Sequence, residues 1–333
     1  MSLPEINNCP GTLAEGFDTY SPLALRRVFS GKKVSHILPY TSPQEDGRNT
    51  AQFIENRKRI SISGVQEKMS LLLEKNKLRL TLEGEQGTYI LKPIPRDIKH
   101  TSQVPANEHL TMQIARQVYG INTAENALIF FEDGSPAYLT LRFDSRPDGG
   151  KYRKEDFASL AGKSNDSEGP DFKYHYSYQE LAELIKKYVP SWRVEMEKFL
   201  KLVVFNYLFS NGDAHLKNFA LLETQSGDFV LSPAYDLLNT RIHVDDPHFA
   251  LNDGLFSDGF QSWKWKKQGA PGKLDFIEFA KRIGIQESRI ELLLSPFIER
   301  QPLVDALISR SYLNPELKKG YQLYYNSKRN FLQ

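Results

Sequence analysis

Residues 192–239 read WRVEMEKFLKLVVFNYLFSNGDAHLKNFALLETQSGDFVLSPAYDLLN, and this stretch decides how the chain is organised. Between positions 199 and 209 almost every side chain is apolar, which is typical of a helix buried on all sides. A polar loop, 211–218, follows it, and the next residues predict a short hairpin around the turn 225–228. Asp236 comes soon after that hairpin. The predicted order is therefore a buried helix, a polar loop, a hairpin and a further acid.

Three polar side chains of this stretch have the types and spacing that phosphoryl transfer needs. Asp213 and Asn218 keep the D-x-x-x-x-N spacing of kinase catalytic loops, and Asp236 stands where a magnesium-binding aspartate is expected. One carboxylate would orient the attacking hydroxyl, while an amide oxygen and a second carboxylate would hold Mg²⁺ against nucleotide phosphates. The same residues also suit a capped helix end followed by turns, because Asn, Gly and Asp cluster in turns. Both interpretations stay open on the residues alone.

Composition bounds the class of protein. The 333 residues allow one large or two ordinary domains, and 43 basic against 41 acidic residues leave a net charge of +2. This balance implies no general attraction to nucleic acid. Cys9 is the single cysteine, so no internal disulfide framework is expected. We find no signal peptide and no apolar run of the ~18 residues that a membrane helix needs. We therefore expect a cytoplasmic protein without membrane contact.

The segment from residue 60 to residue 93 predicts three strands, with turns at 74–77 and 84–87. Lys92 ends the third strand, where it is either a solvated lysine or the lysine with which kinases contact nucleotide phosphates. The preceding residues 61–68 could cradle phosphates through backbone N–H groups. They contain one glycine, so the pattern alone does not establish a phosphate loop.

A helix is predicted over 106–119, with Glu108 in its first turn. Glu108 either stabilises the helix dipole or pairs with Lys92. A second hairpin is expected around 133–134, and most of the later chain is helical. This order predicts an α+β, two-lobed protein-kinase-like fold. Its β-rich N-lobe, residues 1–145, would contain one αC-like helix, and its mostly helical C-lobe would comprise residues 146–333.

Two further regions lie after residue 240. Residues 241–272 lack periodicity, which favours an irregular connection over an activation or substrate loop. Within them WKWKK, 263–267, is basic and aromatic, as in some nucleic-acid contacts. We prefer to interpret it as a local solvated patch. Three helices are predicted between residues 273 and 312.

Seven motifs together carry a family resemblance: SISGVQEKMSLLL, YILKP, ANEH, LRFD, EDFASLAG, NGDAHLKNF and LSPAYDLLNT. In this order and spacing they resemble the HipA family of toxin serine/threonine kinases over roughly residues 58–310. HipA proper carries a longer region before the phosphate loop. With only residues 1–60 there, the chain looks more like HipT, the short kinase of tripartite HipB–HipS–HipT modules.

The resemblance implies a role for each matching residue. Asp213 would orient or deprotonate the acceptor serine, and Asn218 and Asp236 would bind Mg²⁺. Lys92 would contact the ATP phosphates with support from Glu108, and Arg142, Phe143 and Asp144 would hold adenine and ribose. Ser61 and Ser63 fall where the family autophosphorylates. The remaining residues implied in ATP binding are Ser63, Gly64, Val65, Gln66, Glu67, Lys68 and His215.

The resemblance also implies a substrate and partners. It predicts an ATP-dependent protein kinase that phosphorylates a serine of an aminoacyl-tRNA synthetase, with the tryptophanyl enzyme associated with HipT, and so stops growth and favours persistence. The antitoxin partners would be a HipS-like small protein and a HipB-like DNA-binding protein. The chain would contact DNA only indirectly, through the antitoxin. Two alternatives remain: a small-molecule kinase, or a non-catalytic module bound to an antitoxin at its operator.

Overall fold

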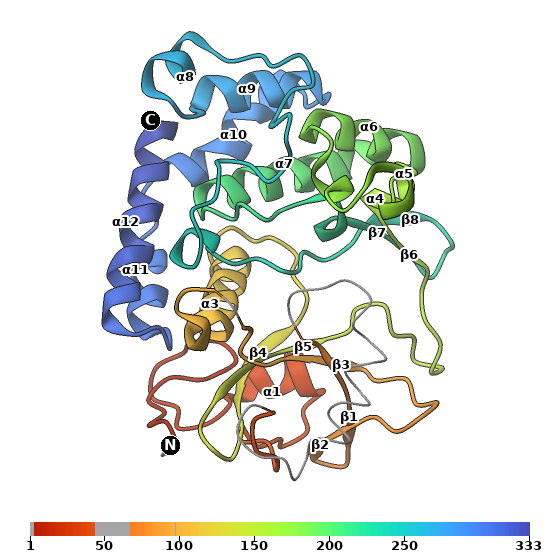
Figure 1. The fold of residues 1–333 in the computed structure, drawn as a ribbon, viewed down its shortest axis with the longest axis vertical. Coiled ribbons are helices and arrows are strands. Elements are labelled where there is room, and N and C mark those ends of the chain that lie inside the picture. Colours follow the sequence, from red (N-terminus) through yellow and green to blue (C-terminus); the bar gives the residue numbers. More distant parts are fainter. Residues whose placement is uncertain (1–2, 44–66, 97) are drawn as a thin grey trace. The chain divides into compact units, whose positions relative to one another are not determined.

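A computed structural model of the chain describes residues 3–43, 67–96 and 98–333 (Figure 1). The chain divides into two compact units, and neither is continuous in sequence. Unit 1 comprises Met1–Ile114, Ala124–Phe143 and Val304–Lys318. Unit 2 comprises Ala115–Thr123, Asp144–Leu303 and Lys319–Gln333.

Unit 1 is built on a five-stranded antiparallel sheet in the order β2-β1-β3-β5-β4. Its strands are β1 Met69–Glu74, β2 Lys77–Leu80, β3 Tyr89–Lys92, β4 Asn126–Phe130 and β5 Pro136–Leu141. The hairpins predicted at 74–77 and around 133–134 are both present, with Glu74 paired to Lys77 and Phe130 paired to Pro136. The central strand β3 pairs with β1 and β5, so that Lys92 lies opposite Tyr138.

The helix α1, Pro22–Phe29, contributes to the core of unit 1. The Ser21 side chain caps it by accepting a hydrogen bond from the Ala24 N–H group, and Pro22 occupies the first turn, where no N–H partner is needed. The Phe29 ring stacks on Tyr89 of β3 at 6.1 Å. Cys9 is a buried free thiol in the same core, and its Sγ accepts the Ser21 N–H group at 3.1 Å.

The predicted αC-like helix exists, but its bounds of 106–119 were wrong by two residues at each end. Helix α3 is Val104–Gln117, and the short turn η1, Thr101–Gln103, leads directly into it. The helix therefore starts before Pro105, since proline is tolerated in a first turn and does not mark the first residue. Gly120 follows the helix in the left-handed conformation at φ 59°, which glycine adopts without strain.

Unit 2 is mostly helical. Its longer helices are α6 Tyr178–Tyr188, α7 Trp192–Leu208, α9 Lys273–Arg282, α10 Glu287–Ile298 and most of α12 Pro315–Leu332. Its shorter elements are α4 Phe157–Leu160, α5 Asn165–Glu168, η2 Phe172–Tyr174, η3 Leu216–Asn218, η4 Thr240–Ile242 and α8 Trp263–Gln268. Most of the remaining helix, α11 Pro302–Arg310, belongs to unit 1. Throughout the described ranges, no helix is long and apolar enough to cross a membrane.

Helix α7 forms the centre of unit 2, as its apolar sequence predicts. Every residue from Leu202 to Leu208 is buried, including the polar Asn206. The Phe205 ring stacks on Phe209 at 4.5 Å, and Tyr119 meets both of these rings edge-on. The carboxyl-terminal half of the helix has no solvent-facing side, so packing determines the position of its carboxyl end.

The hairpin predicted after the polar loop is present as β7 Ala220–Glu223 and β8 Phe229–Leu231. The sequence analysis missed a third strand, β6 Lys154–Asp156, which pairs with β7. Its three charged side chains give no strand signal, because the pairing with β7 alone makes this segment extended.

The sequence analysis also missed helix α12. Its apolar positions include Tyr321, Tyr325 and Leu332, all buried, yet Gly320 and many charged residues interrupt the pattern. In contrast, α8 confirms that WKWKK contains exposed positions: Trp263 is 68 % exposed.

We predict that Phe205→Ala will lower the free energy of unfolding of unit 2 by about 3–5 kcal/mol, because it leaves a cavity among stacked rings. Chemical unfolding followed by tryptophan fluorescence would measure this loss. Val194→Ala on the same helix is the matched control, since Val194 is 60 % exposed and should change stability little. Equal losses in both variants would contradict the central position of this helix end.

Candidate active site

The loop that follows α7 is held by hydrogen bonds from side chains inside unit 2. The Thr240 hydroxyl accepts the Gly212 N–H group at 2.8 Å and donates to the Ser210 carbonyl at 3.0 Å. The Asn211 amide donates to Asn206 Oδ1 at 3.0 Å. The two Thr240 bonds satisfy backbone groups of the loop, and the Asn211 bond ties the loop to a side chain of the helix. The loop is consequently fixed to the helix.

Gly212 is required by close approach. A Cβ atom at this position would lie 2.4 Å from Cβ of Asp246, a separation that packed atoms do not reach. The glycine therefore lets segment 240–246 lie directly against the loop. Sequence reasoning treated Gly212 only as a turn residue.

Asp213 extends from this loop and remains half-exposed, with 49 % of its side chain accessible. Its Oδ1 accepts a hydrogen bond from the Tyr174 hydroxyl at 2.8 Å. Nε2 of His215 lies 3.8 Å from the same oxygen, which is too long for a hydrogen bond. The carboxylate is thus accessible to an acceptor hydroxyl while one of its oxygens is engaged.

His215 is buried next to Asp213. Burial lowers the pKa of His215 to about 4, against the opposing attraction of Asp213 and, more weakly, of Asp236. The imidazole is therefore neutral at pH 7. Because both carboxylates influence this ring, Asp213 and Asp236 lie within electrostatic reach of one side chain. Among the described residues, no hydrogen-bond partner is found for its buried Nδ1.

Asn218 and Asp236 carry the amide and carboxylate oxygens that Mg²⁺ prefers in proteins. The Asn218 side-chain N–H donates to the Asp213 carbonyl at 2.9 Å, which leaves the amide oxygen as the acceptor that a hard cation requires. Asp236 adopts a left-handed φ of 56°, and its carbonyl accepts the Asn211 amide at 3.4 Å. No group of three His, Cys, Asp or Glu side chains that could hold a metal ion gathers in the described ranges.

Unit 1 contains a buried ion pair. Lys92, at the end of β3, places Nζ 2.7 Å from Oε1 of Glu108 on α3, and both side chains are 5 % exposed or less. The Lys92 ammonium also lies 5.4 Å from the centre of the Tyr138 ring. Lys92 is therefore not a solvated strand-end lysine, and the sequence-predicted pair is in contact.

The other predicted site residues are placed as follows. Ser61, Ser63, Gly64, Val65 and Gln66 lie outside the described residues. Glu67 lies 3.6 Å from Arg96. Lys68, with Glu67, immediately precedes β1. Arg142 extends the sheet by donating its backbone N–H to Thr88 at 2.8 Å, and the backbone carbonyl of the buried Asp144 accepts the Tyr152 N–H at 2.8 Å.

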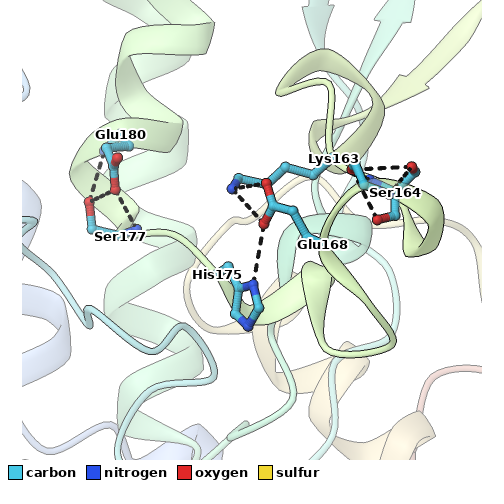
Figure 2. A network of polar contacts seen from close by, with 7 residues as sticks. Lys163, Ser164, Glu168, His175, Ser177 and Glu180 are labelled. Carbon is cyan, nitrogen blue, oxygen red and sulfur yellow. Dashed lines mark hydrogen bonds and ion pairs between the residues drawn. The ribbon is translucent and has the colours of Figure 1, made fainter.

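Tyr174 lies in the sequence between residues that form the polar contacts drawn in Figure 2. Glu168 accepts hydrogen bonds from Lys163 at 2.7 Å and contacts His175 at 3.2 Å. Capping boxes at Ser164 and Ser177 start the two flanking helices. In addition, the Tyr174 carbonyl accepts the Asn252 N–H at 2.9 Å.

Sequence reasoning missed four residues of this site: Tyr174, Asn211, Thr240 and Asp246. Tyr174 lies 39 positions before Asp213, so only tertiary structure connects them. Asn211 was part of the predicted loop, but its hydrogen bond to Asn206 depends on the helix end. A polar residue inside the apolar run, Asn206, is the one signal that could have indicated this bond.

Comparisons with solved structures define the class of fold. The HipA of Shewanella oneidensis, solved with HipB and operator DNA, aligns with 87 % of this chain and 66 % of its own length at TM-score 0.62 and 23 % identity. The Helicobacter pylori proinflammatory kinase CtkA aligns with 79 % of this chain and 93 % of its own length at TM-score 0.51 and 15 % identity. The predicted α+β kinase-like fold class is therefore confirmed.

The chain belongs to the HipA-like C-terminal domain family, because the model of this family matches residues 60–302. A Haemophilus influenzae protein named "Putative kinase" is 25 % identical over 90 % of this chain and 88 % of its own length. "Putative kinase Y4dM" of Sinorhizobium fredii is 30 % identical over 75 % of this chain, and the serine/threonine-protein kinase toxin HipA of Shewanella oneidensis is 26 % identical over 74 %. The chain spans 60 % of the length of each of these last two relatives.

We predict that Glu108→Gln will destabilise unit 1 by about 3–5 kcal/mol, because the Lys92 ammonium would remain buried without its counter-charge. Thermal unfolding would measure the loss. The double variant Lys92→Met with Glu108→Gln should recover part of it, since no unpaired charge then remains buried. If Glu108→Gln unfolds at the wild-type temperature, the ion pair does not stabilise this unit.

Proposed function

We propose that the chain is an ATP-dependent serine/threonine protein kinase that acts as the toxin of a toxin–antitoxin system. The observation that carries the proposal is the loop 211–218, in which Asp213 is half-exposed and the Asn218 amide is fixed on the Asp213 carbonyl. This arrangement separates the two functions that a kinase loop needs, because the carboxylate faces the acceptor and the amide oxygen stays available for a cation. Family membership and the kinase names of the relatives support it.

In the proposed reaction, the acceptor serine Oγ attacks the γ-phosphorus of ATP. A bond forms between Oγ and phosphorus, and the bond from phosphorus to the β,γ-bridging oxygen breaks, so ADP leaves with that electron pair. The serine proton passes to the Asp213 carboxylate, which orients the hydroxyl first. Asn218 Oδ1 and the Asp236 carboxylate would hold Mg²⁺, which neutralises phosphate charge when bound.

The remaining proposed roles concern ATP. Lys92 would contact the phosphates, and its buried pair with Glu108 would keep the ammonium in one orientation. Glu67 and Lys68 would end the phosphate loop, and Arg142, Phe143 and Asp144 would hold adenine and ribose. The neutral His215 would sit beside the nucleotide without adding charge to the site.

The substrate and partners are proposed at a finer level. We place the chain with the HipT type and take an aminoacyl-tRNA synthetase, in the first instance the tryptophanyl enzyme, as the cytoplasmic acceptor. HipS-like and HipB-like proteins would be the antitoxin partners. The HipB-like protein would bind DNA, and the chain would reach DNA only by binding that protein. The Shewanella oneidensis HipA was solved with HipB and operator DNA, which supports a partner of that kind.

Asp213→Ala should reduce phosphoryl transfer by about 10²–10⁴-fold, because the general base and orienting group is lost. The measurement is transfer from γ-labelled ATP to cell lysate proteins and to purified tryptophanyl-tRNA synthetase, together with growth during expression. Asp245→Ala is the control, since its side chain is 95 % exposed. A label found only on metabolites would indicate a small-molecule kinase. An Asp213→Ala variant as toxic as the wild type would exclude catalysis as the cause of toxicity.

We further propose that autophosphorylation at Ser61 or Ser63 switches the kinase off. A phosphoserine adds a charge of about −1.5 to −2 and would repel the triphosphate of ATP. Ser61→Asp and Ser63→Asp should therefore weaken ATP binding relative to the corresponding alanine variants, as measured by calorimetry. Unchanged affinity and activity in both aspartate variants would refute this regulation.

A further inference from the structure

The contact between Tyr174 and Asp213 goes beyond the parts that the proposed kinase reaction requires. The Tyr174 hydroxyl donates to Asp213 Oδ1 at 2.8 Å, while the other nearby polar group, His215 Nε2, lies at 3.8 Å. Among the contacts of the described residues, Tyr174 therefore supplies the hydrogen bond to this carboxylate. The tyrosine comes from η2, a segment far from the loop in sequence.

A carboxylate has two oxygens and rotates about its Cβ–Cγ bond unless a partner holds it. The bond from Tyr174 occupies Oδ1 and so selects one orientation of the group. Oδ2 is then left to receive the acceptor hydroxyl. Since the Asp213 side chain is half-exposed, packing alone does not supply this restraint.

The Tyr174 hydroxyl is suited to act as a permanent donor. Burial, followed by the adjacent Asp213 charge, raises the pKa of Tyr174 well above its ordinary value, so the phenol stays protonated at any physiological pH. The Tyr174 ring also meets the buried His215 ring edge-on at 5.4 Å. The ring plane is therefore supported from the side of the catalytic loop.

Hydrogen bonds also hold the backbone at Tyr174 and its neighbours. Its carbonyl accepts the Asn252 N–H at 2.9 Å, and the next residue, His175, contacts Glu168 at 3.2 Å (Figure 2). A second pairing follows, because the Tyr178 N–H donates to the Gly254 carbonyl at 2.9 Å. Because its backbone is already held, Tyr174 loses little further conformational entropy when it restrains Asp213.

We propose that Tyr174 is a positioning residue for phosphoryl transfer, which holds Asp213 through Oδ1 so that Oδ2 faces the acceptor hydroxyl. The inference rests on the proposed kinase function. It differs from autoinhibition, in which the Tyr174 hydroxyl would block the place of the acceptor and its removal would speed the reaction.

Tyr174→Phe keeps the ring and removes only the hydroxyl. With lysate protein at fixed concentration and ATP varied, we expect kcat to fall about 10–100-fold while KM for ATP changes less than about twofold. Tyr176→Phe is the matched control, because it makes the same change two residues away on the same segment and should retain wild-type kcat. Thermal unfolding of both variants would show whether either change disturbs the fold.

Each result of this assay decides a different question. A lower kcat with unchanged KM and unchanged melting temperature in Tyr174→Phe supports the positioning role. A kcat equal to or above that of the wild type overturns it, and an increase would point to autoinhibition. Equal losses in Tyr174→Phe and Tyr176→Phe also overturn it, since the effect would then belong to the segment. No transfer by the wild type would refute the proposed function itself, and the role of Tyr174 with it.

Discussion

The candidate site depends on the hydrogen bonds that anchor its polar loop to the buried carboxyl end of α7. The end of this helix carries the stacked rings of Phe205 and Phe209, which Tyr119 meets edge-on. Carbonyl and N–H groups in such surroundings need protein partners. Thr240 provides them for Ser210 and Gly212 of the loop, and the Asn211 side chain connects the loop to Asn206 of the helix and to the Asp236 backbone. These bonds hold the loop that carries Asp213 and Asn218, and they join it to the backbone of Asp236.

The charged side chains of the two units differ in burial and in pairing. In unit 1, Lys92 and Glu108 are both buried and neutralise one another at 2.7 Å. In unit 2, Asp213 stays half-exposed, while burial keeps its neighbour His215 neutral at pH 7. A buried pair holds a fixed orientation, whereas an accessible carboxylate can meet a substrate. Each arrangement suits the role we propose for it.

Fold and family do not by themselves assign an activity, because one fold supports several functions. Membership in the HipA-like C-terminal domain family restricts the choice, and the loop geometry adds an independent argument. The chain spans only 60 % of the length of its HipA toxin relative. Experiments with this chain must therefore identify its substrate and partners, and the synthetase and the antitoxins are proposals.

The sequence alone predicted the elements that follow from local pattern: the buried helix α7, the hairpins of both sheets and the fold class. Periodicity and turn residues carry that information. It did not predict β6, whose charged residues become a strand only by pairing with β7, nor α12, whose apolar stripe is interrupted by Gly320. At the site, D-x-x-x-x-N spacing indicated Asp213 and Asn218. Tyr174 and Thr240 could not be found in this way, because their roles arise from contacts across 39 and 28 positions that only the folded packing creates.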